Sequence, residues 1–266
     1  MPIEWLLAYL VLGSITGLVA GLFGIGGGGL MVPVLSLFFA AQGFADDYRV
    51  HLALGSSMAA IVPTALASMR AHHRYRAVLW PVVARMTPGV LLGTFAASFL
   101  AAHLSAKPLA IIFSGFMAYV ALQMLLGRKP KPSRQLPGPV GMAATGTAIG
   151  GVSALVAIGG GTLTVPFLTW CNQRLPVAIG TSAALGLPIA LAGALGYIIN
   201  GWGQSNLPGG SLGFVYGPAV VAMACASWFT APLGARLAHR LPVTRLKKLF
   251  ALLLVGLSLE MLRSLL

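Results

Sequence analysis

The chain has 266 residues, of which 58% are hydrophobic and only 8% are charged. Soluble domains carry roughly 25% charged residues, so a water-soluble globular protein is excluded. The apolar content also excludes intrinsic disorder, and two cysteines are too few for a disulfide scaffold. Charge-free stretches such as 5–45 and 175–235 lack the alternating pattern of an outer-membrane barrel. They predict an all-α polytopic helical membrane protein.

The distribution of charge predicts an orientation in the membrane. The formal net charge is +13, and most basic residues gather in the segments 70–76, 128–134 and 236–248. Cytoplasmic loops of membrane proteins are enriched in Lys and Arg, so we expect these segments in the cytoplasm and the N-terminus, with Glu4, outside. This placement explains the basic excess without a nucleic-acid partner. The N-terminus has no basic segment before its apolar run, which argues against a cleaved signal peptide.

The apolar segments predict ten helices. In chain order they cover 5–23, 30–41, 51–70, 78–103, 108–126, 139–157, 162–172, 177–199, 212–235 and 246–265. A helix needs about 20 residues to cross the bilayer, so the second and seventh segments are too short to cross untilted. Each of the two follows a glycine cluster. They are therefore expected to be halves of broken or re-entrant helices.

Two pairs of segments show an internal repeat. Residues 24–35 match 157–168 at eight of twelve positions, and residues 54–68 match 179–193 at seven of fifteen. If both glycine hairpins return to their starting side, the two halves have opposite orientations. The sequence thus predicts one membrane domain, 1–266. It contains repeat 1 (1–126), a basic cytoplasmic linker (127–139) and an inverted repeat 2 (140–266).

The glycine clusters suggest a binding site for an anion. Where glycines interrupt a helix, the next half-helix starts with unpaired N–H groups and the positive end of its dipole. An anion is a natural partner for such a start. Inverted repeats with broken helices at matching positions are typical of transporters, which bind substrate near the membrane midplane. The alternative is close helix packing, for which glycine is common in membranes. The candidate glycines are Gly26, Gly27, Gly28, Gly159, Gly160 and Gly161.

Further candidates lie on the neighbouring segments. Hydroxyls that could donate to oxyanion oxygens are Ser56, Ser57, Thr181 and Ser182, although each could instead bond to its own helix. Arg85, inside a predicted span, could contact the anion or extend to the interface. The matched residues with an expected structural role are Pro33, Gly55, Pro63, Pro166, Gly180 and Pro188.

Several absences narrow the chemistry. No acidic residue lies inside a predicted span, which argues against a cation pathway or a carboxylate proton relay. The five histidines are expected at the membrane interface, His72 among them, and Cys171 and Cys225 are expected to be packing residues. No zinc-ligand spacing, catalytic constellation or dinucleotide motif is present. We therefore expect no metal, no cofactor and no enzymatic activity.

The repeated motifs resemble those of the sulfite exporter TauE/SafE family. The resemblance rests on GLVAGLFGIGGGGLMVPVL (17–35), LALGSSMAAIVPTALAS (52–68), AIGGGTLTVPFL (157–168) and IGTSAALGLPIALAG (179–193). It implies a permease of the bacterial inner membrane for sulfite or organosulfonates, most often outward. The basic loops would then be cytoplasmic and the N-terminus periplasmic. The second copy has Ala157 and Thr162 where the first has glycine, which leaves open whether both halves contact substrate.

Two alternative functions are also compatible with the sequence. The chain could be a permease for another small solute, including uptake. It could also be a non-transporting assembly or anchoring partner that acts through the basic segment 128–134. The expected partners are a small anionic substrate and the lipid bilayer, and a homo-oligomer is left open.

Overall fold

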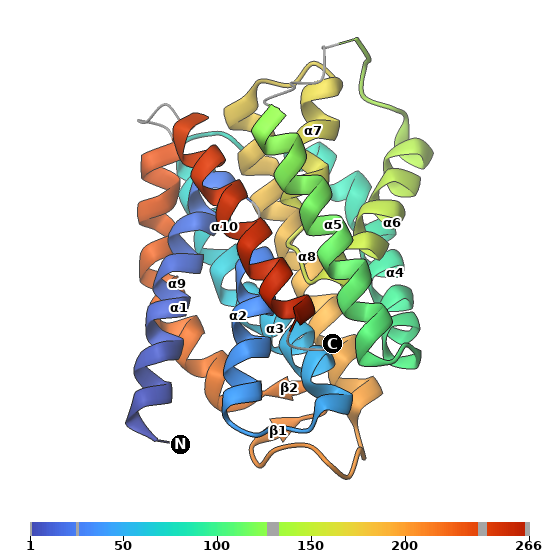
Figure 1. Cartoon of the computed structure of the whole chain (residues 1–266). Coiled ribbons are helices and arrows are strands. Elements are labelled where there is room, and N and C mark those ends of the chain that lie inside the picture. Colours follow the sequence, from blue (N-terminus) through green and yellow to red (C-terminus); the bar gives the residue numbers. More distant parts are fainter. Residues whose placement is uncertain (1, 25–26, 127–132, 239–243, 264–266) are drawn as a thin grey trace.

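The computed structural model describes residues 2–24, 27–126, 133–238 and 244–263, with the backbone alone for 244–249. Within these ranges it contains ten helices and one β-hairpin (Figure 1). The helices are α1 (Ile3–Phe23), α2 (Gly28–Ala41), α3 (Asp46–Arg74), α4 (Trp80–His103), α5 (Ala106–Leu126), α6 (Pro139–Val156), α7 (Gly161–Trp170), α8 (Leu175–Gly201), α9 (Gly217–Ala238) and α10 (Thr244–Arg263). The antiparallel strands are β1 (Ser211–Leu212) and β2 (Val215–Tyr216). In the described part of the chain, seven helices are long and apolar enough to cross a membrane. The predicted all-α polytopic fold is confirmed.

Local signals account for the helix boundaries. Proline stands in the first turn of α4, α6 and α8, where its missing N–H costs little. The longest helix, α3, begins with Asp46 and Asp47 and has Arg74 in its last turn, so charges of both signs complement the helix dipole. The helix α1 ends at Gly24, which has a left-handed conformation.

Corresponding helices of the two halves run in opposite directions (Figure 1). The helices α1, α3 and α5 rise from the lower end, whereas α6, α8 and α10 descend from the upper end. The short helix α2 returns towards the end where α1 began, and α7 returns towards the end where α6 began. Both glycine clusters therefore form hairpins.

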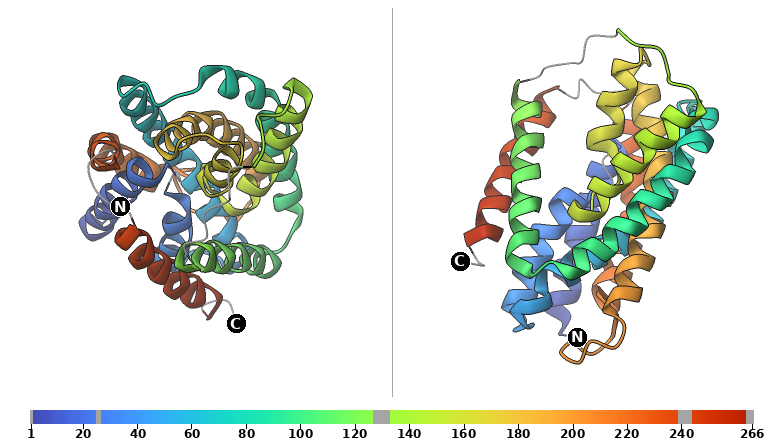
Figure 2. Two further views of the ribbon diagram at one scale, coloured as in Figure 1. Left: turned by 90° about the horizontal axis from the view of Figure 1, so that it is seen from above. Right: turned by 90° about the vertical axis from the view of Figure 1, so that its right-hand side faces the viewer.

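The helix pairing is exchanged between the halves. The central helices α3 and α8 pack against each other, α1 packs along α9, and α4 packs along α6 (Figure 2). Small residues permit close approach in both outer pairs: Gly13 and Gly17 face the α9 backbone, and Gly146 and Gly150 face α4. If α1 corresponds to α6 and α4 to α9, the two outer pairs are equivalent.

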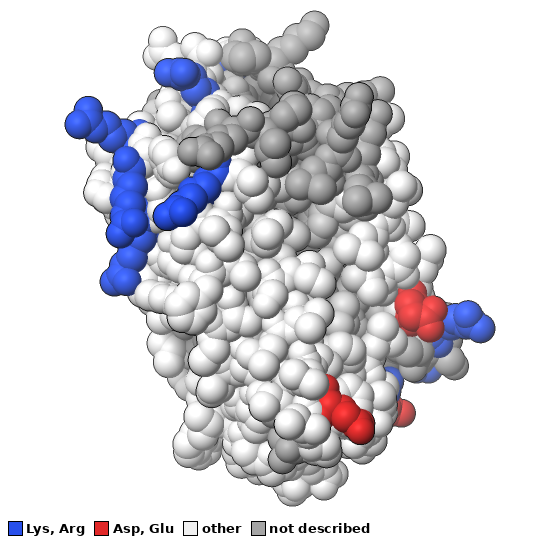
Figure 3. Space-filling model, turned by 90° about the vertical axis from the view of Figure 1, so that its left-hand side faces the viewer, with Lys and Arg blue, Asp and Glu red and all other residues white. Residues whose placement is uncertain are grey.

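Basic side chains gather at one end of the molecule, whereas the opposite half has side chains of both signs, among them the ion pair of Arg49 with Asp46 (Figure 3). We call the end where α3 and α9 finish the basic end; Arg70, Arg74 and Arg236 lie there. We call the opposite end, where α1 and α3 start, the acidic end. All four acidic residues are exposed, and Glu4, Asp46 and Asp47 lie at this end, in the first turns of α1 and α3.

Two expectations about local structure were wrong. The helix predicted over 212–235 starts later, because residues 211–216 form the β-hairpin, in which Gly213 packs on the backbone of Ile198 with a φ of 54°. His72 was expected in a basic loop, but it lies in the last turn of α3. The helix α3 extends beyond the predicted 70 and packs against α1, so the His72 side chain is fully buried and its Nε2 donates to the Gly21 carbonyl at 3.0 Å.

Candidate functional site

The residue that precedes each short half-helix has nearly the same backbone conformation in both copies. Gly27 precedes α2 with φ 81° and ψ −9°, and Gly160 precedes α7 with φ 77° and ψ −11°. The preceding helices also end alike, at Gly24 (φ 69°) and Ala157 (φ 44°). These left-handed conformations favour glycine. We call these two connections, 24–28 and 157–161, the first and second breaks. The candidate residue Gly26 lies outside the described residues.

The half-helices that follow the breaks start with buried donors. Their first intrahelical bonds run to the carbonyls of Gly27 and Gly160. Four further N–H groups belong to buried residues and have no acceptor among the described residues: those of Gly28, Gly29, Gly161 and Thr162. Buried backbone donors are nearly always paired in proteins, so these groups are suited to a ligand that brings acceptor oxygens.

Helix α7 adds two side-chain hydroxyls. Thr162 and Thr164 are buried, and neither hydroxyl has a hydrogen-bond partner among the described residues. The Thr164 Oγ1 lies beside the start of α7, 3.4 Å from where a Cβ on Gly160 would lie. Sequence reasoning missed both threonines, although the departure of the second copy from glycine at Thr162 was a signal.

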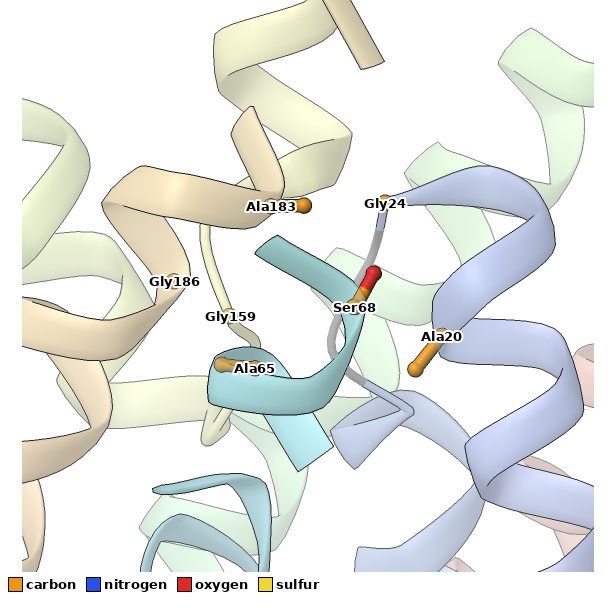
Figure 4. Close-up of a pocket in the computed structure, with 7 residues that line it drawn as sticks. All are labelled: Ala20, Gly24, Ala65, Ser68, Gly159, Ala183 and Gly186. Atoms are coloured by element: carbon orange, nitrogen blue, oxygen red, sulfur yellow. The ribbon is translucent and has the colours of Figure 1, made fainter. Parts of the chain in front are cut away.

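The fold brings the two breaks together in the core. The Ala157 carbonyl oxygen packs so closely on Gly28 that a Cβ there would overlap it. Gly24 and Gly159, one from each break, line a small cavity together with Ser68 of α3 (Figure 4). The two half-helix starts thus lie in one central region.

The motif hydroxyls Ser56 and Thr181 hold the connections to the next helices. The Tyr216 N–H, just before α9, donates to Ser56 Oγ at 2.9 Å, and the Leu79 N–H, just before α4, donates to Thr181 Oγ1 at 3.0 Å. Matching hydroxyls therefore make matching bonds in the two halves. Both oxygens accept from backbone outside their own helix, which gives them a structural role.

The second pair of motif hydroxyls is asymmetric. Ser182 Oγ donates to the Gly24 carbonyl at 3.2 Å. Its counterpart Ser57 is fully buried, and its hydroxyl has no partner among the described residues. One hydroxyl therefore holds the first break, whereas the other is free to donate.

The matched glycines and prolines have mainly structural roles. Gly55 packs on the Phe214 carbonyl and Gly180 on the Ala77 carbonyl, each too closely for a side chain. The matched prolines are Pro33 and Pro166, each the sixth residue of its half-helix, and Pro63 and Pro188, inside α3 and α8. The first pair lies beyond the first turn, so these prolines also remove the helical bonds to the carbonyls four residues earlier.

A further matched pair of contacts was not predicted. Tyr197 OH donates to the Ala154 carbonyl at 2.9 Å, and His72 bonds to Gly21 at the corresponding place in the other half. The next connections follow the same pattern: the Phe214 N–H donates to the Tyr197 carbonyl, and the Ala77 N–H donates to the His72 carbonyl, both at 3.1 Å. Because tyrosine and histidine differ, the alignment of the halves gave no signal for this pair.

Comparison with known proteins identifies the family. The family model "Sulfite exporter TauE/SafE" matches residues 9–261. The chain belongs to this family. It is 35% identical to a probable membrane transporter protein of Haemophilus influenzae, over 97% of this chain and 98% of that protein. It is 25% identical to the probable membrane transporter protein YunE of Bacillus subtilis, over 92% and 93% of the two chains. No solved structure matches the chain significantly.

The remaining candidates in this TauE/SafE-family chain lie away from the breaks. Arg85 is exposed on the outer face of α4, which agrees with extension towards the interface rather than with a contact in the core. The described residues contain no group of three His, Cys, Asp or Glu side chains that could hold a metal ion. The cavity between the breaks is lined by small residues, of which Ser68 is the one with a polar side chain.

Proposed function

We propose that this protein is a membrane transporter that moves a small sulfur-containing anion, sulfite or an organosulfonate, outward across the bacterial inner membrane. The observation that carries the proposal is the meeting of two buried half-helix starts, each with N–H groups that lack an acceptor among the described residues. Backbone donors and the positive ends of two helix dipoles suit oxyanion oxygens. Family membership supports the sulfur-containing class.

The charge distribution supports an anion over a cation. All four acidic residues are exposed, so no carboxylate is available in the core. With the cell interior negative, each negative charge that moves outward gains about 2.3 kcal/mol per 100 mV. An anion exporter of this kind needs no coupled ion.

We further propose that 1–126 and 140–266 are inverted repeats, with the basic end in the cytoplasm and the N-terminus in the periplasm. The opposed helix directions, the exchanged pairs α1–α9 and α4–α6, and the matched bonds of Ser56 and Thr181 support the repeat. The gathering of Arg residues at the basic end supports the orientation.

The test is flux through the purified protein in proteoliposomes. Labelled sulfite, sulfate and a short alkanesulfonate are compared with and without an imposed membrane potential. We expect flux of sulfite or the sulfonate that rises when the potential drives the anion across. Flux of a different solute alone, or no anion flux from folded protein, would contradict the proposal.

A matched pair of variants tests the site. Thr164→Val removes a buried hydroxyl that has no protein partner, so we expect reduced flux with little loss of stability. Thr145→Val is the control, because that hydroxyl already bonds to the Gly141 carbonyl of its own helix. Equal flux in the two variants would remove Thr164 from the site.

A further inference from the structure

The two breaks meet each other differently at their two junctions. At one junction the Ala157 carbonyl, which ends α6, packs directly on Gly28 at the start of α2. Elsewhere between the two breaks, Gly24, which ends α1, and Gly159 of the second break line a cavity (Figure 4). The cavity is about 10 Å³, room for one water-sized group. We call the contact of Gly28 with Ala157 the closed junction, and the cavity beside Gly24 and Gly159 the open junction.

Side-chain size explains the difference. Ala183 and Gly186 of α8 line the open junction. The repeat aligns them with Met58 and Ile61 of α3. At the closed junction the Met58 sulfur lies 3.0 Å from where a Cβ on Gly193 would be, and Ile61 Cδ1 lies 3.2 Å from the equivalent point on Gly28. These two large side chains fill the place that the cavity occupies in the other half.

The cavity contains one unsatisfied polar side chain. Ser68 is only 2% exposed, and its hydroxyl has no hydrogen-bond partner among the described residues. Figure 4 shows this hydroxyl pointing towards Gly24. The repeat places Gly193, which has no side chain, at the matching position in α8. A buried hydroxyl without a protein partner requires one from a ligand or water.

The cavity lies nearer to one end of the molecule than to the other. Gly24 ends α1 and Ser68 lies near the end of α3, so the cavity is in the half of the molecule nearer the basic end. Met58 and Gly193 lie in the half nearer the acidic end. The positive potential of the basic end would raise the local concentration of anions there.

We propose that the cavity is the half of the anion path that opens to the basic end, that Ser68 donates to an oxygen of the sulfite or sulfonate, and that Met58 and Ile61 close the other half. This inference rests on the proposed function. Because the cavity holds one water-sized group, the anion enters as the surrounding helices separate. When the path opens to the acidic end instead, Ser57 donates to the Ala157 carbonyl, in the same way as Ser182 donates to the Gly24 carbonyl in the present structure.

Thiol accessibility tests the sidedness without requiring transport. Ser68→Cys and Met58→Cys are made separately in a chain in which Cys171 and Cys225 are replaced by serine. A membrane-impermeant thiosulfonate is applied to oriented vesicles from each side. We expect Ser68→Cys to react from the side of the basic end, with a rate that a short alkanesulfonate lowers, and Met58→Cys to resist reagent from that side. No reaction of Ser68→Cys, or reaction from the acidic end alone, would overturn the proposal.

Flux separates a binding role of Ser68 from a structural one. Ser68→Ala should raise the half-saturating concentration of the transported anion about tenfold while the thermal unfolding temperature stays the same, because no protein bond is lost. Met58→Ala should make Ser68→Cys reactive from the acidic end as well. An unchanged half-saturating concentration in Ser68→Ala would overturn the role of Ser68. Absence of flux in the wild-type chain would refute the proposed function instead, and the labelling pattern would still decide whether the cavity opens to the basic end.

Discussion

The first and second breaks have similar conformations at their described ends and differ in their surroundings. Gly27 and Gly160 have φ angles within a few degrees of each other, 81° and 77°. The first break has Gly24 and Gly29 where the second has Ala157 and Thr162. In the first break, Gly28 is in close contact with the Ala157 carbonyl. In the second break, Gly159 lines a cavity.

This comparison distinguishes what the shared glycines determine from what the differing side chains determine. The shared glycine pattern produces the same chain reversal twice, because left-handed residues are needed at the same positions. Motif positions at which the two copies differ, such as Met58 and its counterpart Ala183, decide whether the space beside each reversal is filled. The two copies can therefore adopt one backbone and still present an open and a closed side.

The largest expected effect is at the closed junction. In Gly28→Ala the new methyl group overlaps the Ala157 carbonyl oxygen, and this backbone atom cannot move aside as a flexible side chain could. We therefore expect a loss of about 3 kcal/mol in stability, or failure to insert. Gly29→Ala is the control, since its nearest neighbours are the movable ends of Met117 and Leu254. Thermal unfolding in detergent and the yield of folded protein measure both. Equal behaviour of the two variants would mean that the closed junction is not tightly packed.

An intermediate effect is expected from the matched hydroxyls. Ser56→Ala and Thr181→Val each leave a buried or half-buried backbone N–H without its acceptor, at Tyr216 and Leu79. We expect each to cost about 1–3 kcal/mol, and the two costs to be similar. Thermal unfolding of both single variants gives the answer. A large cost for one variant alone would break the equivalence of the halves at this point.

The smallest expected effect concerns the residue that ends α6. Ala157 has a φ of 44°, which disfavours a side chain, so Ala157→Gly should relieve backbone strain. Glycine also raises the conformational entropy of the unfolded chain, which offsets part of this gain. We therefore expect a stabilisation of about 1 kcal/mol or less. Gly24→Ala should have the opposite sign, because its φ is 69° and a Cβ would lie 2.8 Å from the Ile179 carbonyl oxygen. Thermal unfolding measures both changes. A stabilising Gly24→Ala would contradict the account of the breaks.

Much of the fold was predictable from the sequence. The helices and both hairpins follow from apolar length and glycine clusters, which act locally. The α9 boundary was missed because the turn at Gly213 is set by packing on Ile198, which lies in another helix. His72 was misplaced for a similar reason, since only the neighbouring α1 provides the Gly21 carbonyl that accepts its bond.

The candidate site was predictable only in part. The glycines Gly27, Gly28, Gly159 and Gly160 were named from their repetition, and the structure brings their two breaks together. Ser56 and Thr181 were named as donors to a ligand, but they accept bonds from the chain itself. The Ser68 side chain was not named, because a single serine in an apolar segment has no distinguishing pattern.

The sequence by itself determined that this is a membrane protein, which segments are long and apolar enough to cross, where the chain reverses and that the motifs occur twice. These properties depend on local composition and backbone preference, so they can be read from neighbouring residues. The tertiary structure decided which hydroxyls are already bonded, which junction is closed and where a cavity remains. Such features depend on contacts between residues far apart in the chain, as between Met58 and Gly193, and on side-chain volumes that must fit one another in three dimensions.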